Sequence, residues 1–158
     1  SAGVHNFIYA ISPQMDSPKT EDDFLFRWPG DDYVDFIGMD CYHGLNPETF
    51  STNLKRLSDL SSKKMKPCGV TETGVESFSA SDYWTKQILT PATGRQVSMI
   101  VMWRNKFVAG NEADKHYYSV FKGHPSAADF LKFYQSDLTF FSKDLPDMYQ
   151  YADNIKVE

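Results

Sequence analysis

Short apolar segments alternate with helical patterns along the chain, and this alternation limits what the chain can fold into. Apolar runs typical of buried strands cover residues 6–11, 33–40, 66–72 and 97–103. Asn46 and Pro47 open a helical pattern between the second and third runs, and a shorter one over 82–89 precedes the fourth. Buried strands joined by helices predict a parallel α/β architecture.

Local signals predict where two later helices end or begin. Thr90 and Pro91 should end the helix over 82–89. Ser126 and Asp129 have capping-box spacing, which predicts a helix through about Gln135. A string of aromatic residues is predicted to pack this helix against its surroundings: Phe130, Phe133, Tyr134, Phe140 and Phe141.

Composition narrows the class of protein. With 158 residues, 41% of them hydrophobic, the chain can form one domain with a substantial core. No apolar run reaches the roughly 18 residues of a membrane span, and a net charge of −5 argues against a nucleic-acid-binding scaffold. The four histidines lack metal-ligand spacing, so no metal or other cofactor is expected. The first residues, Ser1 to Gly3, do not resemble a signal peptide.

The two cysteines are predicted to be free thiols. Cys41 lies near the end of the second predicted strand, whereas Cys68 lies four residues before Glu72 and therefore lower in the sheet. A disulfide needs Cα atoms within about 7 Å. Strand alternation also predicts that the two side chains point to opposite faces.

Polar residues gather where the predicted strands end. Asp40 and Tyr42 close the second strand, Glu72 closes the third, and Trp103 and Arg104 close the fourth. Active sites of (β/α)8 barrels form at this carboxyl-terminal edge. Because a closed barrel needs about 250 residues, the chain is expected to be a partial (β/α)8 TIM barrel of about four βα units.

Four segments carry a resemblance to a known family: residues 33–42, 71–74, 103–105 and 123–130. Together and in this order they resemble the C-terminal half of glycoside hydrolase family 26, whose best-known members are endo-β-1,4-mannanases. The resemblance implies that residues 1–158 form the C-terminal half of a retaining catalytic barrel. Polymer cleavage further implies a secreted, periplasmic or cell-surface parent enzyme.

The resemblance also implies residue roles. Glu72 matches the nucleophile, Tyr42 the residue that orients it, and Asp40, Trp103 and Arg104 the substrate-binding positions. The family's general acid/base Glu has no matching segment in these residues, so the chain alone is expected to be a very poor enzyme. Asp40 is not expected to replace it, because the family places the acid across the barrel.

Less specific interpretations remain open for individual residues. A Glu at a strand end is by default a surface residue, Asp40 is as readily a brace for Arg104 as a sugar ligand, and Trp103 is compatible with a plain core position. His124, before Pro125, is more typical of a loop brace than of a proton shuttle.

Three functional hypotheses follow. The first is a retaining mannanase acting on mannan, galactomannan or glucomannan. The second is a non-catalytic half-barrel that binds glycan or pairs with a partner, because open sheet edges invite pairing with the missing N-terminal half or a second copy. The third keeps the glycosidase and changes the linkage to that of a β-glucan or xylan.

Overall fold

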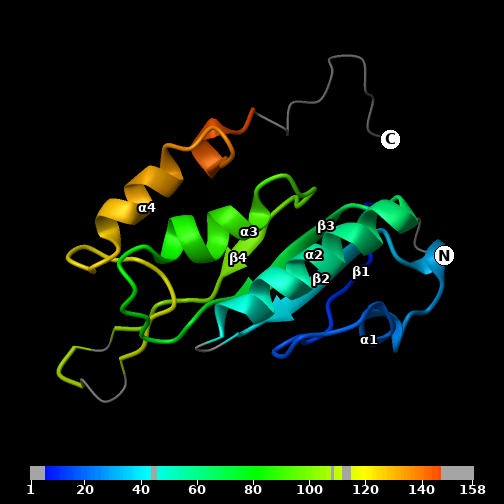
Figure 1. Cartoon of the computed structure of the whole chain (residues 1–158), viewed down its shortest axis with the longest axis horizontal. Helices are drawn as coiled ribbons and strands as arrows, with labels where there is room; N and C mark the ends of the chain where they lie inside the picture. Colours follow the sequence, from blue (N-terminus) through cyan, green and yellow to red (C-terminus); the bar gives the residue numbers. More distant parts are fainter. Residues whose placement is uncertain (1–5, 44–45, 108, 112–114, 147–158) are drawn as a thin grey trace.

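The structure is a computed structural model that describes residues 6–43, 46–107, 109–111 and 115–146 (Figure 1). Within these residues no helix is both long and apolar enough to cross a membrane. In chain order the elements are β1 (Ala10–Ile11), α1 (Glu21–Leu25), the 3₁₀ helix η1 (Asp31–Tyr33), β2 (Phe36–Cys41), α2 (Pro47–Lys64), β3 (Cys68–Thr73), the π-helix η2 (Trp84–Leu89), α3 (Thr90–Ala92), β4 (Ile100–Met102), α4 (Ala127–Tyr134) and the 3₁₀ helix η4 (Ser142–Asp144).

The four strands form one parallel sheet in the order β1-β2-β3-β4. This order and the intervening helices confirm the predicted α/β class and the partial (β/α)8 barrel. Figure 1 shows α2 lying along β2 and β3, with α3 and α4 stacked beyond β4. Consecutive strands are neighbours, so the carboxyl ends of β2, β3 and β4 meet at one edge of the sheet.

The core lies between the sheet and its helices. Ile37, Met39 and Cys41 of β2 point toward α2 and are buried with its Leu54 and Leu57. Alternation sends Gly38 to the other face, where an added Cβ would meet the side chains of Ser12 and Thr71. One face of the sheet is therefore packed on helices, and the other carries Gly38 and Asp40.

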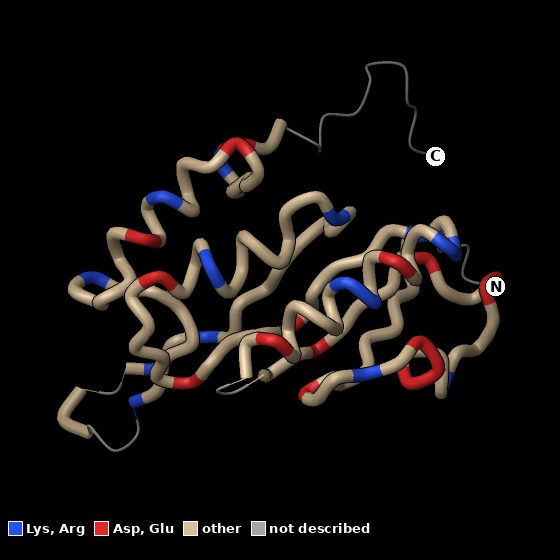
Figure 2. The backbone as a smooth tube through the Cα atoms, viewed as in Figure 1, with Lys and Arg blue, Asp and Glu red and all other residues tan. Residues whose placement is uncertain are grey.

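Helix α2 forms where the sequence predicts it. The Asn46 side chain accepts a hydrogen bond from the Glu48 N–H at 3.2 Å, and Met65 ends the helix in the left-handed conformation with φ 52°. Lys63 pairs with Glu21 of α1 at 2.5 Å, which places acidic α1 beside the basic end of α2 (Figure 2). Such exposed ion pairs contribute at most about 1 kcal/mol to the free energy of unfolding.

The outer strands are shorter than predicted. The apolar run over 6–11 yields a two-residue strand, and the prediction that it is buried is wrong: Phe7 is 67% and Ile8 76% exposed. The run over 97–103 yields only Ile100–Met102, with Val101 42% exposed. Within the described chain each of these strands has a neighbour on one side only, so its other edge has no strand partner.

The helical segment after β3 continues past its predicted end. Residues 84–89 are π-helical, and Thr90–Ala92 extend the helix instead of ending it. The Thr90 N–H still donates to the Thr85 carbonyl. Pro91 has no N–H to donate to the preceding turn, and the helix ends one residue after it, at Ala92.

Helix α4 begins after Ser126 as predicted, but the capping box is wrong. Ser126 Oγ instead accepts from Trp84 Nε1 at 2.9 Å, and Asp129 accepts from the Thr85 N–H and hydroxyl at 2.9 and 2.7 Å. Both side chains thus join α4 to the π-helix. Of the predicted aromatic packing, Phe130 and Phe133 contact the Trp84 ring, whereas Phe140 is 72% exposed.

The free thiols are confirmed, although one reason for them is wrong. Cys41 and Cys68 are both buried, and both face the helices rather than opposite faces. Burial raises the pKa of Cys41 to about 12 and raises that of Cys68.

Candidate functional site

The candidate site is built at the carboxyl ends of β2 and β3. In the strand register Met39 pairs with Val70, but the next pair is Asp40 with Glu72, so Thr71 is an extra residue and forms a β-bulge. Regular alternation would send Glu72 toward α2, as it does the buried Val70. The bulge instead turns Glu72 to the side of Tyr42.

Tyr42 and Glu72 are in direct contact. The Tyr42 hydroxyl donates to Glu72 Oε2 at 2.8 Å, and both residues are half-buried. Partial burial, then the hydrogen bond and the charge of Glu72, raise the pKa of Tyr42, with smaller contributions from Tyr118 and Asp40. The phenol therefore stays protonated at neutral pH and remains a donor to the carboxylate.

Asp40 is the register partner of Glu72 and lies on the face opposite α2. Its carboxylate oxygen Oδ1 accepts from the hydroxyls of Ser12 at 3.0 Å and Thr71 at 2.9 Å. Among the described residues no hydrogen bond or ion pair joins Asp40 to Arg104. The structure therefore does not support Asp40 as a brace for Arg104, and its role as a sugar ligand stays a prediction.

Trp103 and Arg104 follow β4 on the other side of Tyr42. The half-buried Trp103 ring meets the Tyr42 ring edge-on, with centroids 6.3 Å apart and an 84° angle between planes. Trp103 thus lies outside the main hydrophobic core. Arg104 is exposed, and its charge reaches Tyr118, where it lowers the pKa of the phenol against the larger opposing effects of burial and Glu76.

Three residues at this edge were not predicted. Asp16 Oδ1 accepts the Tyr42 backbone N–H at 2.7 Å. Tyr118 places its ring edge-on against Tyr42, with centroids 5.9 Å apart, and Asn105 hydrogen-bonds to the backbone of Tyr118 and Ser119. Only Asn105 had a local signal, because it directly follows Trp103 and Arg104.

His124 is a loop brace, as predicted. It is buried, its Nε2 lies 3.0 Å from the Phe78 carbonyl oxygen, and its Nδ1 lies 2.8 Å from Ser126 Oγ. In the described part of the chain no three His, Cys, Asp or Glu side chains gather in a way that could hold a metal ion.

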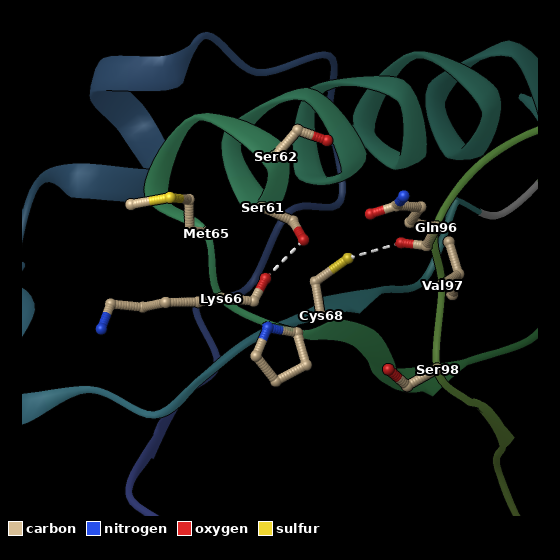
Figure 3. Close-up of a pocket in the computed structure, with 9 residues that line it drawn as sticks. Ser61, Ser62, Met65, Lys66, Cys68, Gln96, Val97 and Ser98 are labelled. Atoms are coloured by element: carbon tan, nitrogen blue, oxygen red, sulfur yellow. Dashed lines mark hydrogen bonds between the residues drawn. The ribbon is translucent and has the colours of Figure 1, made fainter.

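A pocket of about 710 Å³ lies at the opposite end of the sheet, between the end of α2 and the segments that precede β3 and β4 (Figure 3). Two of its side chains are already paired: Ser61 Oγ donates to the Lys66 carbonyl at 2.5 Å, and Cys68 Sγ to the Gln96 carbonyl at 3.1 Å. Because barrel active sites lie at the carboxyl ends of strands, this pocket is not the candidate site.

Known proteins resemble this chain in both sequence and fold. The family model of glycosyl hydrolase family 26 matches residues 1–87. A mannan endo-1,4-β-mannosidase of Bifidobacterium adolescentis is 30% identical over 164 aligned residues, which cover 91% of this chain and 16% of that protein.

Solved structures of family 26 proteins also resemble this chain. A family 26 β-mannanase of Bacteroides ovatus superposes with a TM-score of 0.79 and 33% identity, covering 98% of this chain and 44% of the other. A family 26 protein of a Muricauda species gives 0.78 and 29%, covering 92% and 40%. The chain thus spans less than half the length of each of these relatives.

Proposed function

The chain belongs to glycosyl hydrolase family 26, and from that premise we propose that it is the C-terminal half of the barrel of a retaining endo-β-1,4-mannanase. Glu72 is the nucleophile of this enzyme, and Tyr42 orients it. The observation that carries the proposal is the Tyr42–Glu72 hydrogen bond at the carboxyl ends of adjacent barrel strands. The names of the relatives support mannan as the substrate.

The reaction proceeds in two displacements. The ionised Glu72 carboxylate attacks the anomeric carbon, the glycosidic C–O bond breaks, and the leaving oxygen takes a proton from an acid group. Water then attacks the glycosyl ester and gives a proton back to that group, which restores Glu72 with the anomeric configuration retained. A hydrogen bond from Tyr42 favours the charged form of the carboxylate that this chemistry requires.

Substrate recognition falls to three residues around this pair. The Trp103 ring offers an apolar face for the C–H groups of a sugar. The exposed Arg104 guanidinium has donors for hydroxyl groups, and Asp40 has acceptor capacity beyond its two hydroxyl donors. All three lie beside Tyr42 at the same edge of the sheet.

The acid comes from the other half of the barrel. Two carboxylates adjoin the Tyr42–Glu72 pair, but Asp16 accepts the Tyr42 backbone N–H and Asp40 accepts from the Ser12 and Thr71 hydroxyls, so neither is free to serve as the acid. Exposed apolar residues near the β1 and β4 edges, such as Ile8 and Val101, support an N-terminal half that covers both. Without that half, the chain is expected to hydrolyse mannan more slowly by roughly 10²-fold or more. A polymeric substrate favours a secreted, periplasmic or cell-surface enzyme.

Trapping of the glycosyl-enzyme tests the nucleophile directly. The parent protein is incubated with a 2-deoxy-2-fluoro-β-mannoside carrying a dinitrophenolate leaving group, which departs without help from an acid. We expect intact mass to rise by one fluoro-sugar and peptide mapping to place it on Glu72. Glu72→Gln should remain unlabelled, whereas the exposed Glu48→Gln on α2 should label at the wild-type rate.

Labelling of another carboxylate would overturn the assignment of Glu72. The linkage that the enzyme cleaves is tested separately, by comparing hydrolysis of mannan, mixed-linkage β-glucan and xylan by the untreated parent.

The exposed edges also favour a second candidate, a non-catalytic half-barrel that pairs with a partner chain or a second copy. A stable dimer in gel filtration together with no labelling would support that candidate.

A further inference from the structure

The chain that follows β4 folds back over the candidate site. Lys106 and His116 exchange two backbone hydrogen bonds at 2.7 and 3.0 Å, which closes a loop between them. The residues after His116 then reach the segment after β3, where the Ser77 N–H donates to the Tyr117 carbonyl at 2.8 Å. Tyr118 is the residue that this path brings against Tyr42.

Asn105 fixes the returning backbone at Tyr118. Its Oδ1 accepts the N–H groups of Tyr118 at 3.0 Å and Ser119 at 2.9 Å, while its Nδ2 donates to the Ser119 carbonyl at 3.1 Å. One side chain amide therefore satisfies three backbone groups of an irregular segment. The position of Tyr118 relative to the end of β4 is set by this amide.

The Tyr118 ring has little room to move. It packs on Gly74, where an added Cβ would lie 2.9 Å from ring carbon Cδ1, and Gly74 has a φ of 148° that favours glycine. The ring also meets the Tyr42 ring edge-on, and burial and the charge of nearby Glu76 raise the pKa of the Tyr118 phenol. Tyr42 thus has two edge-on ring neighbours, Trp103 and Tyr118.

We infer that Tyr118 is a positioning residue, which acts through Tyr42 by holding the Tyr42 hydroxyl on Glu72. The inference rests on the proposed function and adds a residue that does not touch the nucleophile. A phenol on a free rotamer would lose this bond for part of the time, because the hydrogen bond requires one ring orientation. The charged groups near Tyr42 are Glu72, Asp40 and Asp16, the last of which accepts its backbone N–H. Those near Tyr118 are Glu76 and Arg104.

The test measures the pH dependence of trapping in the parent protein, with the same fluoro-mannoside. Tyr118→Ala removes the ring that supports Tyr42, and we expect trapping to slow by about ten- to a hundredfold. The acidic limb of its pH profile should move to higher pH, because the carboxylate loses a hydrogen bond that favours its charged form. Tyr118→Phe keeps the ring, so the acidic limb of its pH profile should lie at the same pH as that of the wild type.

Combination with Tyr42→Phe separates positioning from a structural role. That variant alone should shift the acidic limb as Tyr118→Ala does, and adding Tyr118→Ala to it should give no further shift. The inference would be overturned if Tyr118→Ala lowered the amount of trapped enzyme without moving the acidic limb. It would also be overturned if Tyr118→Ala moved the limb equally in the wild type and in Tyr42→Phe. If the wild type labels elsewhere than Glu72, the proposed function fails instead, so the two failures are distinguishable.

Discussion

The inner strands β2 and β3 have six residues each and pair on both sides, whereas β1 has two residues, β4 has three, and each pairs on one side within the described chain. All four come from similar apolar runs in the sequence. The inner pair is enclosed by α2 and carries Tyr42 and Glu72 at its ends. All four strands end within one residue of their apolar run, so the local sequence indicates where a strand ends, while its neighbours determine how long it is and whether it is buried.

The inner and outer strands also contribute differently to the proposed function. The inner strands carry the proposed nucleophile, Glu72, and the residue proposed to orient it, Tyr42, already joined by a hydrogen bond. Exposed apolar residues lie at the outer strands, Ile8 just before β1 and Val101 within β4, which is the expected condition of edges that another part of a barrel covers. In the proposed mannanase the nucleophile therefore belongs to this chain, whereas the part of the barrel that covers the outer strands lies outside it.

The largest expected effect comes from a pair of matched leucine truncations. Leu54 of α2 is fully buried against the inner strands, whereas Leu138 after α4 is 60% exposed. Leu54→Ala should lower the free energy of unfolding by about 2–5 kcal/mol, because it leaves a cavity. Leu138→Ala in the 158-residue chain should change it by less than about 0.5 kcal/mol. Urea unfolding measures both, and equal losses would remove the distinction between the two regions.

A smaller effect tests whether a second half covers β4. Val101→Thr exchanges a methyl for a hydroxyl at nearly constant volume. In the 158-residue chain, where Val101 is 42% exposed, the free energy of unfolding should change by less than about 0.5 kcal/mol. In the parent protein the same change should cost about 1–3 kcal/mol, because the hydroxyl becomes buried. A neutral result in both proteins would show that β4 remains an open edge.

The same division explains what the sequence could predict. Helix α2, the inner strands and the order of the site residues follow from local patterns, because their apolar faces and caps act within a few residues. The capping box failed because Ser126 and Asp129 have partners more than 40 residues away, Trp84 and Thr85. Tyr118 was missed because a returning loop, rather than a strand end, brings it to Tyr42.

The bulge at Thr71 illustrates this limit within the site itself. A strict alternation from Val70 would have pointed Glu72 into the helix layer. One extra residue, whose hydroxyl is held by Asp40, reverses that direction. The sequence carries the residues of the site, but the register that aims them belongs to the paired strands.

The smallest effect concerns His43, which lies at the enclosed end of β2 against Phe50. Burial lowers the pKa of this imidazole, so the folded protein holds it neutral, whereas the unfolded chain protonates it near pH 6.5. Its contribution to stability is therefore present above that pH and is lost as pH falls below it, with a slope of at most about 1.4 kcal/mol per pH unit.

Urea unfolding of the 158-residue chain at pH 7.5 and 5.5 measures this slope. His43→Gln should lose less stability than the wild type between the two values, because the unfolded variant takes up one proton fewer. His116→Gln is the matched control, since His116 is half-buried on the loop after β4, and it should keep the part of the slope that His43 contributes. An unchanged slope in His43→Gln would show that the end of β2 is open to water, which would bring the inner region closer to the outer one.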